Sequence, residues 1–60
     1  MNEKIREQIL QVRDTGLCNM LDTKHVQVIA NSMDFYELVV FIEEHRNEYE
    51  HFIMTGKTED

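Results

Sequence analysis

The stretch FYELVVFIEEHRNEYEHFIM, residues 35–54, decides the fold of this chain. Apolar, aromatic and histidine side chains recur in it at intervals of three and four residues, which places them on one stripe of an α-helix: Phe35, Leu38, Ile42, His45, Tyr49 and Phe52. Further apolar residues lie off this stripe: Val39, Val40, Phe41 and Ile53. The first half of the helix is therefore apolar nearly all round, and such a helix has more than one surface to bury.

The signals at both ends of this stretch predict one long helix. Asp34 as N-cap and Glu37 three residues later approximate a capping box, and Met33 and Leu38 are spaced as a hydrophobic staple. Gly56 stands where a left-handed residue ends a helix. We therefore predict a helix from Asp34 to about Thr55, followed by a polar tail at residues 57–60.

Two shorter helices precede it. Asn2 is suited to cap a first helix that ends at about Thr15, and Gly16 is suited to terminate it. Asp22 is suited to cap a second helix that ends near Ser32 or Met33. The predicted buried faces of the two are Ile5, Ile9 and Val12, and Val26, Ile29, Ala30 and Met33. The sequence thus predicts an all-α fold, a single three-helix domain over residues 1–56: helix, short helix, long helix.

A chain of 60 residues is marginally stable without further support. The usual supports are disulfides, a metal or oligomerisation. The single cysteine, Cys18, excludes an internal disulfide, and no Cys/His metal framework or cofactor motif is present. We therefore predict a homodimer, or a higher closed assembly, through the long helix. The predicted self-association residues are Val39, Phe41, Ile42, His45, Tyr49, Phe52 and Ile53.

The composition indicates in which cellular compartment the protein works and which classes of partner are unfavourable. A lone thiol fits a reducing compartment, and neither a signal peptide nor an apolar run of about 20 residues is present, so we expect a cytoplasmic protein. The net charge is −6, and the six Lys and Arg residues are scattered along the chain. A nucleic acid or an anionic membrane would need a local basic patch, which the sequence does not contain.

No catalytic or metal-binding motif is convincing. Asp14-Thr15-Gly16 spells the motif of aspartic proteases, but it ends a predicted helix instead of lying in a β-rich cleft. Glu48-x-x-His51 has the spacing of di-iron sites, yet His45 and His51 are six residues apart and diverge around the helix. Nothing basic adjoins Cys18, as a catalytic thiol requires. We therefore expect a protein that is not an enzyme.

The long helix is acidic as well as apolar. Residues 22–54 have the outline of a DNA-binding helix-turn-helix, but the second helix carries five glutamates against one arginine, the wrong charge for DNA. Glu44 and Glu48 are like charges four residues apart, which is mildly unfavourable within a helix and hints at a partner. The predicted partner-binding residues are Glu43, Glu44, Glu48 and Glu50, with a solvated face that keeps the protein soluble as the simpler interpretation.

Six stretches that together span nearly the whole chain are typical of one family: NEKIREQI (2–9), VRDTG (12–16), NM-x-D (19–22), VQVIA (26–30), FYELVVFIEEHR (35–46) and FIMTG (52–56). In these stretches the chain resembles a family of very short proteins encoded by phages and prophages, chiefly of Gram-positive bacteria, which is known as a domain of unknown function. The chain departs from the family at Leu21, where an aromatic residue is expected, and at Cys18, where a small polar residue is usual. The resemblance implies the cytoplasm of a bacterial host and supplies no catalytic residues.

This resemblance implies a non-enzymatic protein that binds and modulates or inhibits a host protein, including components of anti-phage defence. Two alternatives stay open. A nucleic-acid-associated phage regulator would need basic side chains that converge in a folded dimer. A small-molecule or signal-binding sponge would need a pocket at the dimer seam lined by Arg or Lys.

Overall fold

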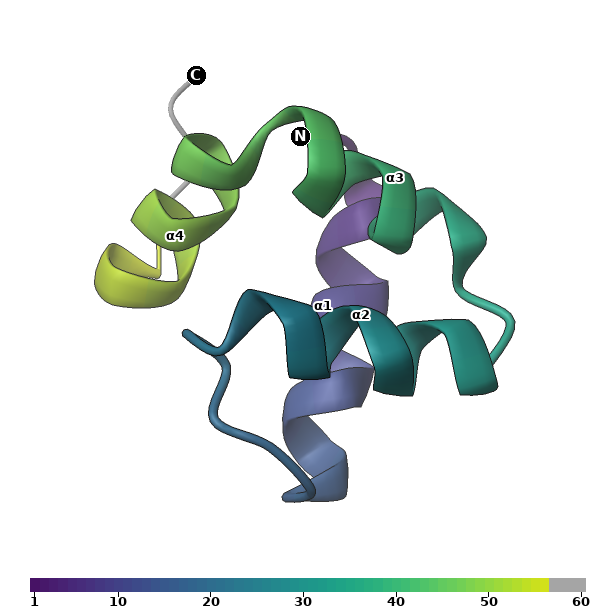
Figure 1. The fold of residues 1–60 in the computed structure, drawn as a ribbon. Helices are drawn as coiled ribbons and strands as arrows, with labels where there is room; N and C mark the ends of the chain where they lie inside the picture. Colours follow the sequence, from purple (N-terminus) through teal and green to yellow (C-terminus); the bar gives the residue numbers. More distant parts are fainter. Residues whose placement is uncertain (57–60) are drawn as a thin grey trace.

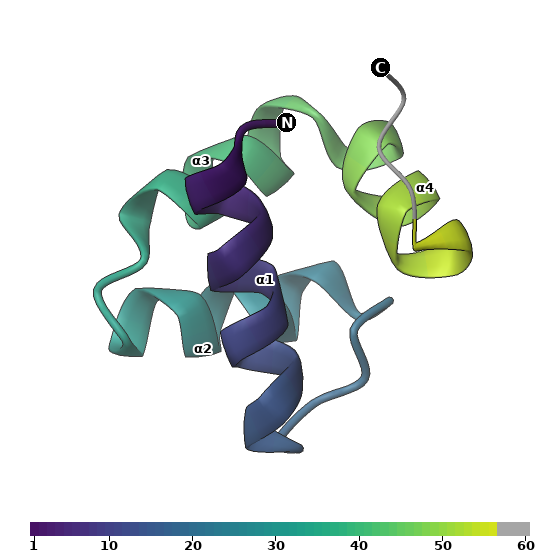
Figure 2. The same cartoon turned by 180° about the vertical axis from the view of Figure 1, so that it is seen from behind.

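The computed structural model describes residues 1–56, and this part of the chain is all-helical, without a strand. It contains α1 (Glu3–Thr15), α2 (Thr23–Ser32), α3 (Tyr36–Glu44) and α4 (Arg46–Thr55) (Figure 1). Helices α2 and α3 form an antiparallel hairpin, α1 crosses one side of it, and α4 turns away from the end of α3 (Figure 2). The tail predicted for residues 57–60 lies outside the described residues. Within residues 1–56, no helix is long and apolar enough to cross a membrane.

The first two helices begin and end where the sequence predicts. The side chain of Asn2 accepts a hydrogen bond from the amide of Ile5 (2.8 Å), and Gly16 ends α1 in the left-handed region at φ 66°. The side chain of Asp22 accepts a hydrogen bond from the amide of His25 (3.3 Å) and caps α2. These ends are local features, since each depends on residues within a few positions.

The turn between α2 and α3 corrects the predicted start of the long helix. Asp34 is not an N-cap, because it lies in the left-handed region at φ 64° and Phe35 precedes the helix instead. The amide of Asp34 donates to the Asn31 carbonyl (3.1 Å) and the amide of Phe35 donates to the Ala30 carbonyl (2.8 Å). This pair of bonds is the Schellman motif, in which a left-handed residue follows the last turn of a helix. Asp34 therefore ends α2.

The predicted long helix is wrong, because the chain bends at His45 and forms two helices in its place. His45 has φ −135° and ψ 48°, so it ends α3 and precedes α4. Its amide still donates to Phe41, and its carbonyl accepts from Tyr49. The three-helix prediction thus becomes four helices. The end of the last helix is confirmed, since Gly56 follows α4 at φ 73°.

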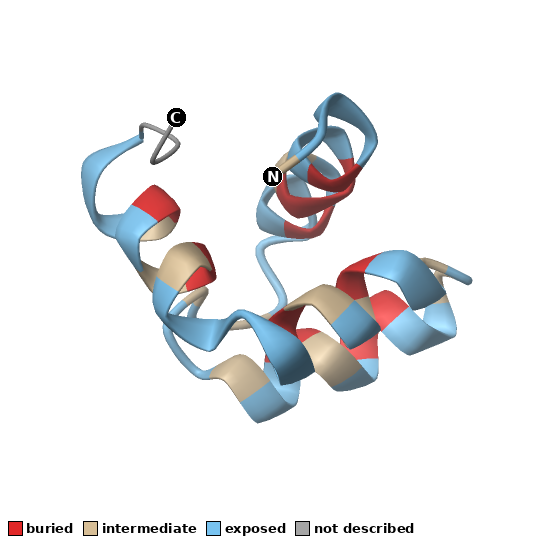
Figure 3. Cartoon of the chain, turned by 90° about the horizontal axis from the view of Figure 1, so that it is seen from above, coloured by how far each residue is buried: buried red, intermediate tan, exposed pale blue. Residues whose placement is uncertain are grey.

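The bend turns both halves of the apolar stripe onto one core (Figure 3). Ile42 and Tyr49 are 0% exposed and Phe52 is 6% exposed, packed with the buried faces of α1 and α2. These three predicted self-association residues are therefore covered by their own chain. Val39, Phe41 and Ile53 are half-buried against the same core, and His45 is exposed. A bent chain buries apolar surface that a straight helix would have left for a partner.

The core is held at one side by α4. The Tyr49 hydroxyl donates a hydrogen bond to the Met20 carbonyl (2.6 Å), which joins α4 to the connection between α1 and α2. Burial raises the pKa of the Tyr49 phenol well above its usual range, and the nearby Cys18 and Glu50 act in the same direction. α4 is thus attached to the rest of the core mainly through buried aromatic side chains.

Candidate functional site

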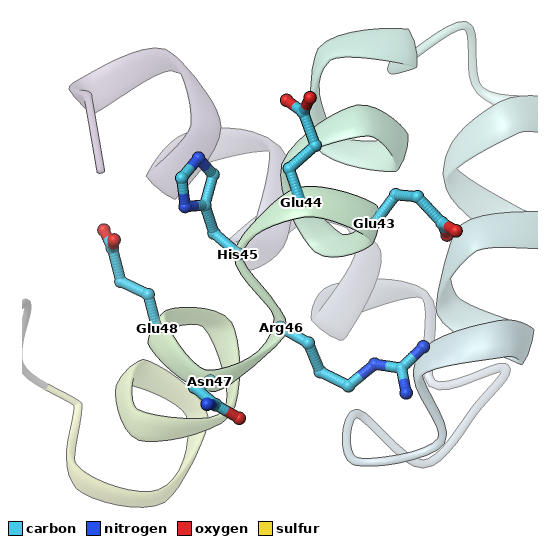
Figure 4. Close-up of a pocket in the computed structure, with 6 residues that line it drawn as sticks. All are labelled: Glu43, Glu44, His45, Arg46, Asn47 and Glu48. Carbon is cyan, nitrogen blue, oxygen red and sulfur yellow. The ribbon is translucent and has the colours of Figure 1, made fainter.

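The bend between α3 and α4 creates an acidic hollow of about 440 Å³. We call it the junction hollow, and it is lined by Glu43, Glu44, His45, Arg46, Asn47 and Glu48. In Figure 4, Glu44, His45 and Glu48 project to one side of the bend, while Glu43 and Arg46 project to the other. Three of the four predicted partner-binding glutamates therefore line one hollow, with Glu43 on the opposite side of the bend from Glu44 and Glu48. Glu50, the fourth, is half-buried on α4 and does not line the hollow.

Glu43 is held in place by α2. Gln27 of α2 donates through its side-chain nitrogen to a Glu43 carboxylate oxygen (3.1 Å) and to the Val39 carbonyl (3.0 Å). One amide side chain thus connects α2 to two successive turns of α3. Because an amide is uncharged, this hydrogen bond positions the carboxylate of Glu43 without pairing it with an opposite charge.

Glu48 is held by the beginning of the chain. Its carboxylate is 2.7 Å from the amino group of Met1, and it lies in the first turn of α4, where a negative charge is favoured by the helix dipole. This ion pair joins the start of the chain to α4. The charge of Glu48 is therefore partly neutralised within the molecule.

Glu44 and Arg46 are the charges of the junction hollow that face solvent without a partner in residues 1–56. The other ion pairs between side chains of this part join Lys4 to Glu37 (2.8 Å) and Arg6 to Glu3 (3.1 Å). Both lie away from the hollow lining. The hollow consequently has two carboxylates without an ion-pair partner among residues 1–56, Glu44 on one side of the bend and Glu43 on the other.

His45 adds an aromatic surface to the hollow. Its ring centroid is 5.4 Å from that of Phe41, one turn earlier on α3, with the planes tilted by 33°. A tilted pair at this separation is a favourable aromatic arrangement. The sequence places His45 on the buried stripe, but the bend turns it outward because it is the residue at which the two helices separate.

A second hollow, of about 450 Å³, adjoins the first between the beginning of α1 and α3. Its lining combines Glu44 and His45, which it shares with the junction hollow, with Asn2, Ile5, Tyr36, Glu37, Val40 and Phe41. Tyr36 is 57% exposed and Val40 is 52% exposed, so these two side chains of the lining are open to solvent, whereas Phe41 is half-buried and Ile5 is buried. Sequence reasoning left Tyr36 out of the site. Tyr36 lies four residues before Val40 on α3, and this spacing places both side chains on the same face of the helix. This spacing is the feature of the sequence that could have identified Tyr36.

The remaining motifs of the sequence lie apart from both hollows. Asp14 and Thr15 belong to the last turn of α1, as expected for a helix end, and Gly16 terminates that helix. Cys18 is half-buried, and partial burial together with the Asp22 carboxylate raises the pKa of its thiol. Within residues 1–56, no group of three or more His, Cys, Asp or Glu side chains is placed to hold a metal ion.

In a comparison with protein families, a family model matches residues 1–57 of the 60-residue chain. The matching family is described as a domain of unknown function (DUF5049). This confirms the resemblance to a family of unknown function over nearly the whole chain. No curated protein matches the chain, and no solved structure matches it.

Proposed function

This chain belongs to the DUF5049 family, a domain of unknown function, and we propose that it acts by binding another protein. In this proposal it is encoded by a phage or prophage, works in the bacterial cytoplasm without catalysis, and modulates or inhibits a host protein, with anti-phage defence proteins as the expected class. The observation that carries the proposal is the gathering of Glu43, Glu44 and Glu48 at the bend between two helices.

The charge of the junction hollow specifies the chemistry of the partner. Glu43 and Glu44 face solvent with Arg46 as the only cation of the lining, on a chain whose net charge is −6. A surface of one sign attracts a partner of the opposite sign and accelerates their encounter. We therefore expect a host protein that presents Lys or Arg side chains to the hollow.

The neighbouring apolar hollow supports the same proposal. Protein interfaces combine a few exposed aromatic or aliphatic side chains with a polar rim. Tyr36, Val40 and Phe41 supply such a surface beside Glu44 and His45. In this arrangement the aromatic and aliphatic residues contribute buried area, and the carboxylates contribute orientation and specificity.

Homodimer formation remains part of the proposal in a modified form. Ile42, Tyr49 and Phe52 are buried in the core of their own chain and are not available to a second chain. A face-to-face dimer of the bent chain therefore has to use the remaining predicted residues, which are the half-buried Val39, Phe41 and Ile53 and the exposed His45. The exposed Val40 and Tyr36 extend that surface.

The test begins with affinity capture from infected host lysate, using the tagged full chain, and continues with the captured protein in purified form. The double variant Glu43→Gln, Glu44→Gln removes two charges from the hollow. We expect it to weaken binding roughly 2- to 30-fold, because exposed charge pairs contribute about 0.2–1 kcal/mol each. Glu48 is left intact because its ion pair with Met1 supports the fold.

The matched control is the double variant Glu7→Gln, Asp14→Asn, which removes two charges from exposed positions of α1 outside both hollows. Binding is measured by titration calorimetry at several salt concentrations. The proposal predicts a weaker salt dependence for the hollow variant than for the control. Equal affinity of the two variants, or capture of nucleic acid instead of one host protein, would overturn it.

A further inference from the structure

The bend at His45 leaves helical hydrogen bonds unmade. Within residues 1–56, no acceptor is placed for the amides of Arg46, Asn47 and Glu48, and His45 supplies no side-chain cap. A continuous helix would pair these amides with the carbonyls of residues 42, 43 and 44. The bend therefore exists at the expense of three backbone hydrogen bonds.

Nothing in the local sequence requires the bend. Residues 44–47 are Glu, His, Arg and Asn, without proline or glycine, and sharp helix breaks are almost always caused by such residues or by an inserted group. The bonds on either side of His45 are those of a helix, since its amide donates to Phe41 and its carbonyl accepts from Tyr49. What holds the bend is the burial of Tyr49 and Phe52 in the core.

α4 is the helix that the rest of the chain holds least extensively. Among the described residues its main helix neighbour is α3, the helix it directly follows, whereas α1, α2 and α3 all pack on one another. Its further attachments include the Tyr49 hydroxyl on the Met20 carbonyl, the Glu48 carboxylate on the Met1 amino group, and the packing of Phe52 in the core. In Figures 1 and 2, α4 lies to one side of the other three helices.

We propose that two copies of this chain exchange α4, with α3 and α4 straightened at His45 into one helix whose second half fills the core of the partner. A straight helix over residues 36–55 would be about 30 Å long. Straightening at His45 directs α4 away from the core onto which the bend now turns it. The α4 of a second chain takes the vacated place. Tyr49, Phe52 and Glu48 then make their present contacts between chains.

The shape and chemistry of the vacated site determine which group can occupy it. It is shaped for the side chains of Tyr49 and Phe52, with the Met20 carbonyl as the acceptor of a hydroxyl. An identical chain supplies those groups in the same arrangement, which is why exchange of an element is a low-cost route to a dimer. This inference deepens the proposed self-association and does not depend on a host protein.

The decisive variant is Arg46→Pro. Residue 46 is the first residue of α4, a position that tolerates proline, and its amide has no acceptor among residues 1–56. In a straight helix the same proline would lie in the interior and its ring would clash with the carbonyl of residue 42. Arg46→Pro therefore permits the bent chain and forbids the straight one. The matched control, Arg46→Ala, removes the same side chain and permits both.

The mass of each protein is measured by gel filtration with light scattering after refolding at low and at high protein concentration. We expect dimers of the unmodified chain and of Arg46→Ala at high concentration, and only monomers of Arg46→Pro. Isotope-filtered NMR on a mixture of labelled and unlabelled chains then locates the contact between Tyr49 and Met20. In the exchanged dimer this contact appears between chains.

A second pair of variants covers the outcome in which Arg46→Pro does not fold. His45→Ala favours a helix at this position and His45→Gly disfavours it, by about five-fold per chain in the straight-to-bent equilibrium. The dimer fraction should therefore be clearly higher for His45→Ala. Equal dimer fractions would contradict the proposal, as would monomers of the unmodified chain at every concentration. A dimer in which Tyr49 still contacts Met20 of its own chain would overturn the exchange and leave a face-to-face dimer in place.

Discussion

Replacing Tyr49 with phenylalanine tests the contact that attaches α4 to the core. The substitution removes the hydroxyl that donates to the Met20 carbonyl at 2.6 Å and leaves the aromatic ring in place. The ring is fully buried, so the variant changes the polar contact without opening a cavity. The loss of stability then reports on that hydrogen bond.

The magnitude follows from the environment of the bond. A hydrogen bond inside a protein contributes about 0.5–1.5 kcal/mol, and a buried carbonyl left without its donor adds a penalty. Since this bond is only partly buried, we expect Tyr49→Phe to lower the free energy of unfolding by about 1–2 kcal/mol. In a domain of this size that corresponds to a decrease in Tm of about 4–16 °C.

The same hydroxyl makes stability depend on pH in the alkaline range. Burial raises the folded-state pKa of Tyr49 above the value of about 10 that holds in an unfolded chain. The contribution of the neutral phenol is therefore complete below about pH 10 and is lost as the pH rises toward the folded-state pKa. Tyr49→Phe removes this contribution, so the stability of the variant should fall less steeply above pH 10 than that of the unmodified chain.

The assay is urea unfolding followed by circular dichroism, at pH 7 and at intervals between pH 9 and pH 11.5. The control is Tyr36→Phe, which removes the hydroxyl of the other tyrosine. The Tyr36 hydroxyl donates to the Asp34 carboxylate (2.9 Å), and this bond raises the pKa of Tyr36, but the side chain is exposed. If Tyr49→Phe were no more destabilising at pH 7 than Tyr36→Phe, the attachment of α4 through Met20 would be refuted.

Three further substitutions test single features of the fold by thermal or urea unfolding. Gln8 is 7% exposed and its side-chain oxygen has no partner among residues 1–56, so Gln8→Met should stabilise the fold by about 1–2 kcal/mol; Gln11→Met, at an exposed position, should not. Asp34→Gly should stabilise by about 0.5–1 kcal/mol because glycine adopts φ 64° freely. A loss of stability there would contradict the expected relief of strain at this residue. Glu48→Gln should destabilise by about 1 kcal/mol through loss of the ion pair with Met1, and acetylation of the amino group should abolish that difference.

The parts of the fold that the sequence predicts are those set by neighbouring residues. Asn2, Gly16 and Asp22 mark the ends of α1 and α2 because each acts on an amide or a dihedral within a few positions. Asp34 shows the limit of this reasoning. An aspartate between two helices suits an N-cap and also a left-handed C-terminal residue, and the backbone hydrogen bonds of the finished turn decide between them.

The sequence predicts the acidic site as a set of glutamates along one helix, but it does not predict the shape of that site. Glu43, Glu44 and Glu48 meet in one hollow because the chain bends between them, whereas Glu50 follows α4 away from it. The sequence does not identify Tyr36 as a site residue, for a related reason. Its importance comes from α1, whose first turn approaches α3 and forms the second wall of the apolar hollow.

The bend itself could not be predicted, because the apolar spacing of residues 35–54 suits both outcomes. For a single chain, bending leaves three amides to water at about 0.5–1.5 kcal/mol each, and it buries Tyr49 and Phe52, aromatic side chains contributing about 1.5–3 kcal/mol each. The free energy gained by burying the two side chains exceeds the cost of the three lost hydrogen bonds by a small margin. That cost is limited because amides at the start of a helix still bind water. Two chains that exchange α4 bury Tyr49 and Phe52 and also form the three backbone hydrogen bonds. The opposing cost is the translational and rotational freedom that the two chains lose on association. That cost decreases as concentration rises, so concentration determines which form predominates.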